Sequence, residues 1–162
     1  MVRTSNESQA ARFRPSRPPS GTDNFGNLLR DPALVMNELV AGQLGRRGFA
    51  DLRPALLAVG QHVQASGSRI TELAERAMLT KATVVYLVDE LERLGYVTRR
   101  PDPADGRAKL IVPTERAIAA ERAARIAVSE IRDAWADLIG EDSMAMLEAE
   151  LRSLRAALWP DA

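Results

Sequence analysis

Basic side chains gather in one short stretch of a chain whose charges balance overall. The 162 residues include 22 basic and 22 acidic side chains, so the formal net charge is zero. Residues 93–109 nevertheless hold five basic and two acidic residues, a local net charge of +3. The basic residues are Arg93, Arg99, Arg100, Arg107 and Lys109. Because arginine and lysine bind phosphate oxygens, and arginine also suits a narrow minor groove, this stretch predicts contact with nucleic acid.

Other kinds of chemistry find no support in the residue types. The absence of cysteine removes disulfides, thiolate metal sites and cysteine redox sensing, and the single histidine, His62, argues against a histidine metal site. The sequence shows no Gly-rich phosphate loop and no metal-ligand spacing, so we expect no cofactor, no metal and no enzymatic activity. No apolar run approaches the length of a membrane span, and the N-terminus lacks a hydrophobic signal core. We therefore expect a cytoplasmic protein that does not contact the membrane.

Two closely spaced helices are predicted just before the basic stretch. The first covers Glu72–Arg76 with Thr71 as its cap, and the second covers Thr80–Arg93 with Thr80 as its cap. One face of the second helix is apolar with helical spacing, at Val84, Leu87, Val88 and Leu91. The other face carries Lys81, Ala82, Val85, Tyr86 and Asp89. This pattern is typical of a helix-turn-helix, whose second helix enters the major groove of DNA.

A β-hairpin is predicted directly after the second helix, which ends at Gly95. Its strands are Tyr96–Arg100 and Lys109–Pro113, and Asp105-Gly106 marks the turn between them. A hairpin that follows a helix-turn-helix is a wing. Arg107, close to the predicted tip, is the side chain that we expect to enter the minor groove.

Further helices are predicted before the helix-turn-helix, and a polar segment precedes them. A helix from Asn27 to Gly45 has an irregular start near Asp31-Pro32, and a second helix covers Leu52–Val63 with Asp51 as its cap. Residues 1–24 are rich in proline, serine and arginine, which predicts a disordered tail with a net charge of +2. This tail is either simply solvated or a basic arm that touches phosphate or a minor groove.

The C-terminal third is predicted to be helical, starting at Thr114 as cap and interrupted at Gly140. Apolar residues recur at steps of three and four in two seams. The first is Ala117, Ala120, Ala124, Ala127, Ile131, Ala134 and Leu138, and the second is Met144, Leu147, Leu151, Leu154 and Leu158. Two seams of this length predict helix-on-helix packing between subunits, with a helical hairpin inside one chain as the alternative.

The most specific part of the chain is ELAERAMLTKATVVYLVDELERLGYVTRRPDPADGRAKLIVPTERA. It resembles the MarR-type (multiple antibiotic resistance) transcriptional regulators, and the resemblance covers roughly residues 30–158. The matching features are Glu72–Glu75, Thr83-Val84, Leu87-Val88-Asp89, Leu91, Gly95–Val97, Asp102-Pro103, Asp105, Arg107 and Thr114. The resemblance implies a mainly α fold with a small β wing, in which a winged helix-turn-helix is joined to a dimerisation domain of terminal helices.

The resemblance also implies function and partners. Members of the family form homodimers on a pseudo-palindromic operator in double-stranded DNA, with recognition helices about one DNA turn (~34 Å) apart. They typically repress nearby genes and release DNA when a small aromatic or anionic effector binds. The implied division is a disordered basic arm at 1–26 and a MarR-like domain at 27–162. Within this domain, 27–50 and 114–160 form the dimerisation helices and 51–113 the DNA-binding lobe. His62 is the one residue that we name for effector binding.

The chain departs from the family pattern at positions that read DNA. Met78 stands where the turn often has glycine, and Val85 and Tyr86 stand where a polar residue and an arginine are common. In the wing, Gly106 replaces one of two arginines, and Ala117 replaces a glycine after the helix start. Direct readout would then depend on apolar contact with thymine methyl groups, on the Tyr86 hydroxyl and on Lys81.

The residues predicted to contact DNA lie in the second helix and in the wing. They are Thr80, Lys81, Ala82, Thr83, Val85, Tyr86, Arg99, Arg100, Asp105, Arg107 and Lys109. The leading prediction is a dimeric, ligand-responsive repressor. The alternative is a winged-helix module that binds a protein partner and has weakened or lost DNA binding, because an exposed apolar stripe can also accept a partner helix.

Overall fold

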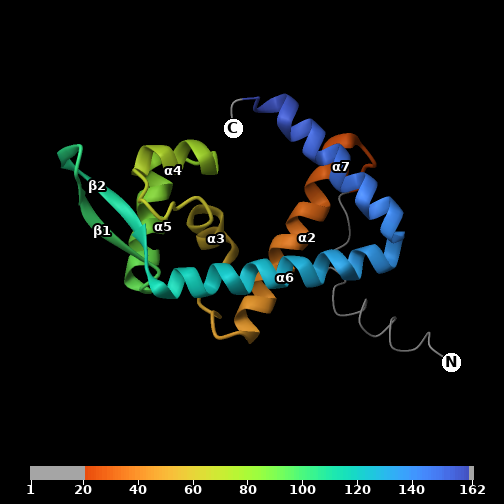
Figure 1. The fold of residues 1–162 in the computed structure, drawn as a ribbon, viewed down its shortest axis with the longest axis horizontal. Coiled ribbons are helices and arrows are strands. Elements are labelled where there is room, and N and C mark those ends of the chain that lie inside the picture. The colour runs from red at the N-terminus through yellow and green to blue at the C-terminus, as the bar shows by residue number, and fades with distance from the viewer. Residues whose placement is uncertain (1–20, 161–162) are drawn as a thin grey trace. The chain divides into compact units, whose positions relative to one another are not determined.

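The computed structural model describes residues 21–160, which form six helices and a two-stranded antiparallel sheet (Figure 1). In chain order the elements are α2 (Phe25–Arg46), α3 (Pro54–Gly60), α4 (Ile70–Ala77), α5 (Lys81–Arg93), β1 (Val97–Asp102), β2 (Asp105–Pro113), α6 (Glu115–Ile139) and α7 (Glu141–Leu158). The predicted mainly α fold with a small β wing is confirmed. Most of the predicted N-terminal arm lies outside the described residues, and its last two positions, Phe25 and Gly26, are already helical.

The described residues divide into two compact units. One unit comprises 21–39 and 128–160, and the other comprises 40–127. The boundaries fall inside α2 and α6 because these helices are long enough to belong to both units. The predicted division by role, at 50/51 and 113/114, concerns binding partners and stays a prediction.

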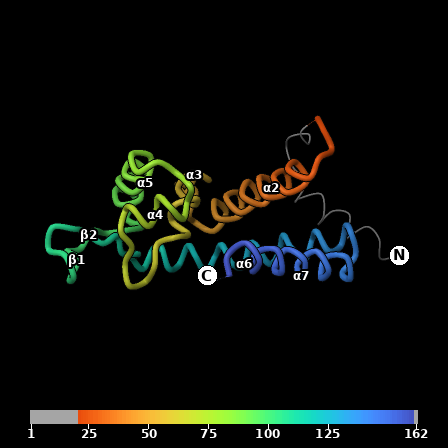
Figure 2. Tube along the Cα trace, turned by 90° about the horizontal axis from the view of Figure 1, so that it is seen from above, coloured from red at the N-terminus to blue at the C-terminus, as the bar shows by residue number. Residues whose placement is uncertain are grey.

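The core of the unit 40–127 is built from the apolar faces of its helices and the base of its hairpin. Its fully buried apolar side chains include Leu44, Leu56, Val59, Leu73, Val84, Val88, Leu91 and Ile111. In Figure 1 α3, α4 and α5 lie together beside the hairpin, and Figure 2 shows the hairpin extending beyond these helices. The predicted apolar stripe of α5 is confirmed, since all four of its residues are buried. This burial fixes which face of α5 points outward.

The hairpin turn lies two residues earlier than predicted. Strands β1 and β2 pair from Val97↔Pro113 to Asp102↔Asp105, with an irregularity between Pro101 and Asp102. The residues between the strands are therefore 103–104, and the prediction of a turn at Asp105-Gly106 is wrong. The physical reason is a side-chain contact, because the Asp102 carboxylate accepts a hydrogen bond from the Ala104 N–H at 2.8 Å and closes the turn there.

Several predicted helix ends are confirmed by local hydrogen bonds and backbone angles. The Thr80 hydroxyl oxygen accepts from the Thr83 N–H at 3.2 Å, and the Thr114 hydroxyl oxygen accepts from the Ala117 N–H at 3.3 Å. Gly95, which follows α5, and Gly140, which separates α6 from α7, have φ values of +78° and +93°. Both angles favour glycine because an L side chain crowds the following carbonyl there.

Three other predicted helix starts are wrong. Helix α4 begins at Ile70 and its cap is Arg69, not Thr71, because the Glu72 carboxylate reaches back to the Arg69 N–H at 3.1 Å. Helix α3 is shorter than predicted and begins at Pro54, since Asp51 is engaged with other side chains. Helix α2 begins at Phe25 and shows no irregular start, although Pro32 lies inside it.

In the other unit, α7 keeps an apolar seam on the surface of the single chain. Arg132 of α6 contacts Glu141 at 2.5 Å and Glu148 at 3.0 Å, and its guanidinium lowers the pKa of Glu141. Met144, the first residue of the second predicted seam, is buried. The rest of that seam is 40–60% exposed, at Leu147, Leu151, Leu154 and Leu158. One chain alone therefore leaves most of this seam uncovered.

Candidate nucleic-acid interface

The outward face of α5 brings together most of the residues predicted to read DNA. Because the buried stripe points into the core, the remaining side chains of the first turns face solvent. The exposed residues are Lys81, Ala82, Thr83, Val85, Tyr86 and Asp89. Thr80 serves as the helix cap, and its hydroxyl lies 2.8 Å from that of Thr83. The helix start is thus ordered by its own polar residues, and the face beyond it is open.

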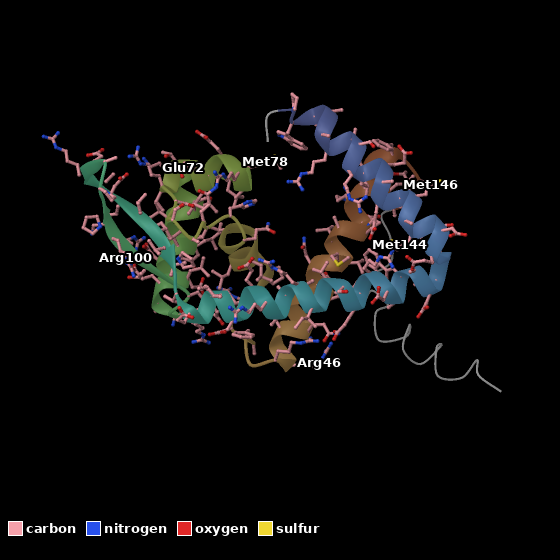
Figure 3. The ribbon with its side chains drawn as sticks, in the orientation of Figure 1. Arg46, Glu72, Met78, Arg100, Met144 and Met146 are labelled. Atoms are coloured by element: carbon pink, nitrogen blue, oxygen red, sulfur yellow. The ribbon has the colours of Figure 1, made fainter. Side chains whose placement is uncertain are left out.

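The turn between α4 and α5 carries an exposed methionine in an unfavourable backbone conformation. Met78 has φ 52° and ψ 41°, the left-handed region, and its side chain is 88% exposed. The Leu79 N–H donates to the Ala74 carbonyl at 3.0 Å, which is the hydrogen bond of a helix end that normally uses glycine. Figure 3 places Met78 at the end of α4 opposite Glu72. This conformation explains why glycine is common at this position.

Arg99 is held by two acidic residues of the same unit. Its guanidinium contacts the Asp89 carboxylate at 2.6 Å and also pairs with Glu92, and its side chain is 23% exposed. Arg99 is one of the residues predicted from the sequence to contact DNA. In the structure its charge balances two carboxylates at the far end of α5, so any contact with phosphate has to compete with these pairs.

The other wing cations are exposed to solvent. Within residues 21–160, no carboxylate pairs with the side chains of Arg100, Arg107 or Lys109. Arg100 of β1 is labelled in Figure 3. Asp105 accepts a hydrogen bond from the backbone N–H of Arg107 at 3.0 Å, so this carboxylate shapes the tip and leaves the guanidinium available. The wing therefore offers three cations to a polyanion.

A buried carboxylate ties the wing to the start of α4. Asp102 is 6% exposed and accepts hydrogen bonds from Arg69 Nε at 2.8 Å and from an Arg69 terminal nitrogen at 2.5 Å. The Ala104 N–H and the Arg69 guanidinium lower the pKa of Asp102. Asp102 belongs to the wing pattern that the sequence shows, whereas the role of Arg69 was not predicted. The two residues are 33 positions apart, and no local signal joins them.

A second network surrounds Tyr96, between the end of α5 and the start of α6. The Tyr96 hydroxyl donates to Asp51 at 2.6 Å, and Arg116 donates to the same carboxylate at 2.7 Å. Arg116 also lies over the Tyr96 ring, 4.5 Å from its centroid, and donates to the Leu94 carbonyl at 3.0 Å. Burial and the hydrogen bond to Asp51 raise the pKa of Tyr96 to about 12. The predicted capping role of Asp51 is wrong because both its oxygens serve this network.

A cavity of about 390 Å³ lies inside the unit 40–127. Its walls come from α3, the end of α5, the start of β1 and α6, and they are mostly apolar, with Leu56, Leu91, Tyr96 and Ile118 among them. Its lining also includes Glu121 and Arg125, which pair with each other at 2.5 Å. His62 does not line it. That side chain is partly buried elsewhere, and burial together with the charge of Arg76 lowers the pKa of His62.

The described part of the chain shows no metal-binding cluster and no membrane-spanning helix. No group of three or more His, Asp or Glu side chains within residues 21–160 is placed to hold a metal ion. Over the same residues, no helix is long and apolar enough to span a membrane. The outward face of α5 and the wing therefore remain the candidate site.

Comparison with known proteins identifies this arrangement. A sequence profile described as the MarR family matches residues 54–108, from the start of α3 into β2. The matched residues include α3, α4, α5 and β1, so this part of the chain is similar to the winged helix-turn-helix of that family. A 42-residue stretch is 48% identical to YcgE of Bacillus subtilis (strain 168), described as an uncharacterised HTH-type transcriptional regulator. That match spans 26% of this chain and 27% of the length of YcgE, so it concerns about a quarter of each protein.

Solved structures with a similar fold cover most of this chain. CouR from Rhodococcus jostii RHA1, solved bound to p-coumaroyl-CoA, is 27% identical, with a TM-score of 0.62 over 88% of this chain and 99% of CouR. A point mutant of MepR from S. aureus, solved bound to an oligodeoxyribonucleotide, is 21% identical, with a TM-score of 0.56 over 85% of this chain and 99% of MepR. The MepR likeness is one of fold.

Proposed function

We propose that this chain is a dimeric transcriptional regulator that binds double-stranded DNA through α5 and the wing and represses nearby genes. The observation that carries the proposal is the open face of α5 beside three wing cations without acidic partners among residues 21–160. A helix of this kind fits the major groove, and the wing cations fit phosphates or a minor groove. The solved MepR structure, which has the same fold, contains an oligodeoxyribonucleotide.

The proposed dimer follows from the uncovered seam of α7. Leucines at steps of three and four are 40–60% exposed in the single chain, and a second copy of the same helix would cover them. A symmetric dimer presents two recognition helices and therefore suits a pseudo-palindromic operator. The alternative of a helical hairpin within one chain does not account for this exposure.

The proposed response to a ligand is supported by the cavity beside Tyr96. A volume of about 390 Å³ falls within the range of small-molecule sites, and the apolar walls with Arg125 among the lining residues suit a small aromatic anion. The solved CouR structure holds a ligand with an aromatic acyl group and phosphates. An anion that draws Arg125 away from Glu121 would have both an apolar wall and a cation to bind.

The experiment that tests DNA binding is a fluorescence-anisotropy titration against DNA flanking the gene, repeated at several salt concentrations. We expect saturable binding to one fragment, tighter than to random DNA, with affinity that falls steeply as salt rises because phosphate contacts release counterions. Equal affinity for all fragments, or no binding at low salt, contradicts the proposal. That outcome would favour the second candidate, a winged-helix module for a protein partner, for which the exposed Val85 and Tyr86 are the supporting observation.

The ligand response is tested by thermal unfolding with a panel of aromatic carboxylates and their uncharged amides. We expect the acids to raise the unfolding temperature more than the amides do. Ala124→Phe should reduce the effect, since Ala124 lines the cavity and phenylalanine would fill it. Ala119→Phe is the matched control, because Ala119 lies on the exposed face of the same helix. If the acids raise the unfolding temperature of the wild type, Ala124→Phe and Ala119→Phe equally, this cavity is not their binding site.

A further inference from the structure

The centre of the outward face of α5 is apolar. Ala82, Val85 and Tyr86 are related by steps of three and four from Ala82, so they share one side of the helix. Val85 is 38% exposed and Tyr86 is 65% exposed. Residues 80–89 contain no arginine, asparagine or glutamine, and Lys81 is the one side chain among them that can form paired hydrogen bonds with guanine. Readout of bases by hydrogen bonds alone is therefore poorly served by this helix.

The exposure of these residues is fixed by the packing of the helix. Val84 and Val88, on the opposite side of α5, are fully buried. Rotating α5 to hide Val85 and Tyr86 would bring the buried valines into water, at a cost of about 1.5–3 kcal/mol for each fully buried side chain. The apolar face consequently stays in solvent until a partner covers it.

The charges around this face favour DNA as that partner. Lys81 precedes it on α5, and the wing contributes Arg100, Arg107 and Lys109. The carboxylate that shares the face, Asp89, is paired with Arg99 at 2.6 Å. An apolar centre with cations beside it and a neutralised carboxylate matches a groove that is walled by phosphates and has an apolar group on its floor.

The thymine C5 methyl is the apolar group that the major groove presents, and none of the other three DNA bases carries it. We propose that Ala82 and Val85 read thymine by packing on these methyl groups, with Tyr86 covering an adjacent one. The proposal rests on the DNA-binding function proposed above and names the bases that this helix selects. It makes Val85 a specificity-determining residue and predicts half-sites with thymines at fixed positions.

The test begins with selection of duplexes from a random-sequence library by the whole chain. The best duplex is then resynthesised with uracil in place of each thymine in the half-sites, which removes the methyl group and keeps every hydrogen-bonding group. We expect each critical replacement to weaken binding about fourfold, the equivalent of one buried methyl group at ~0.8 kcal/mol. Uracil placed outside the half-sites should have no effect.

Two variants connect the methyl group to Val85. Val85→Ala should bind the thymine duplex more weakly and lose most of its discrimination against uracil, because the contact is then missing on the protein side. Arg100→Ala is the control, since it removes an exposed charge from the wing. It should weaken binding to the thymine and uracil duplexes by the same factor and leave the discrimination intact. Alanine favours helix, so the folding of α5 is not at risk in the first variant.

The outcomes separate this inference from the proposed function. Loss of affinity on uracil replacement that depends on Val85 supports methyl readout. Methyl readout is overturned if the chain binds a selected duplex tightly but has equal affinity for its uracil form. It is also overturned if the selected half-sites have no fixed thymines. Either result is still consistent with the proposed DNA-binding regulator. Failure to select any duplex at low salt overturns both, and the apolar face would then belong to a protein partner.

Discussion

The arginines and lysines at and beside the proposed DNA-binding surface fall into two groups, according to whether a carboxylate of the same unit pairs with them. Arg69, Arg99 and Arg116 are bound to carboxylates of the same unit, at Asp102, Asp89 and Asp51. The exposed wing cations have no such partner within residues 21–160. Cations of the first group fix the wing and helices relative to each other, whereas those of the second group are free to meet phosphate or a base edge.

Arg107 is the wing cation for which we expect the largest single effect. Arg107→Ala should reduce specific binding by about 1–3 kcal/mol, the scale of one lost specific contact. The measurement is an anisotropy titration against the fragment that binds best. Arg122→Ala is the control, because it removes an exposed arginine from α6, away from the wing. Equal losses in the two variants would mean that the effect is general electrostatics and not a contact at the wing tip.

We expect the left-handed backbone conformation of Met78 to lower the free energy of unfolding. An L-residue in the left-handed region loses about 1–2 kcal/mol, while glycine loses about 0.5–1 kcal/mol through chain entropy. Met78→Gly should therefore raise the free energy of unfolding by about 0.5–1 kcal/mol in urea titrations at one protein concentration. Leu79→Gly, at the next position, has no positive φ to relieve and should lower it. If both variants are destabilised alike, the exposed Met78 side chain contributes a contact in the assembled protein.

At the scale of elements, Tyr96 connects the end of α5, the cavity and α6. Its ring lines the cavity, while its hydroxyl and Arg116 share the Asp51 carboxylate. A ligand that displaces Tyr96 would therefore disturb the hydrogen bonds that hold the base of the wing against α6. This gives the proposed effector a physical route to the recognition helix.

The raised pKa of Tyr96 predicts a particular dependence of stability on pH. Because its folded pKa is about 12 and the ordinary value is 10, the folded state holds the phenol proton more tightly. The contribution of the protonated Tyr96 hydroxyl to stability is present below pH 10 and is lost as the pH rises towards 12. Tyr96→Phe should lower the free energy of unfolding by about 1.5–3 kcal/mol at neutral pH, the scale of a hydrogen bond to a charged group. In urea unfolding, the difference in the free energy of unfolding between the wild type and Tyr96→Phe should then narrow between pH 10 and 12. A constant gap across this range would exclude proton binding by Tyr96 as its origin.

The elements were predicted from the sequence wherever a local signal defined them. Thr80, Thr114 and Gly140 mark helix ends through contacts or backbone angles within a few residues, and the structure confirms each. The predictions failed where a distant residue decided the outcome. Asp51 had the right type for a helix cap, but Tyr96, 45 positions away, takes its carboxylate.

The candidate site shows the same limit. The exposed face of α5 followed from the period of its buried stripe, and the wing cations followed from composition. The ion pairs of Arg99 and the link from Arg69 to Asp102 join separate elements, so no periodicity in the sequence indicates them. The cavity was also missed, because its lining combines residues of α3, α5, β1 and α6 that are apolar like any core residue. Because the position of the cavity was not known from the sequence, His62 was chosen by residue type alone. It lies outside the lining of this cavity.

At the scale of the whole molecule, we expect the proposed DNA binding to depend on two copies of the chain. One recognition helix and one wing make few contacts, whereas two lobes on one duplex add their binding energies at a high effective concentration. Joining two modules commonly increases affinity by about 10²–10⁴ without any new contact. The uncovered leucines of α7 are the surface that we expect to join them.

Leu151→Asp should therefore produce a folded monomer that binds DNA at least about 100-fold more weakly, because a carboxylate in an apolar interface is costly to bury. Sedimentation gives the oligomeric state, circular dichroism checks that the helices persist, and anisotropy gives the affinity. Ser153→Asp places the same charge on α7 away from the leucine seam, and this variant should remain dimeric with unchanged affinity. A dimeric Leu151→Asp protein would show that the seam is not the interface. A monomeric variant with full affinity would separate assembly from DNA binding, and each winged lobe would then have to recognise its half-site alone.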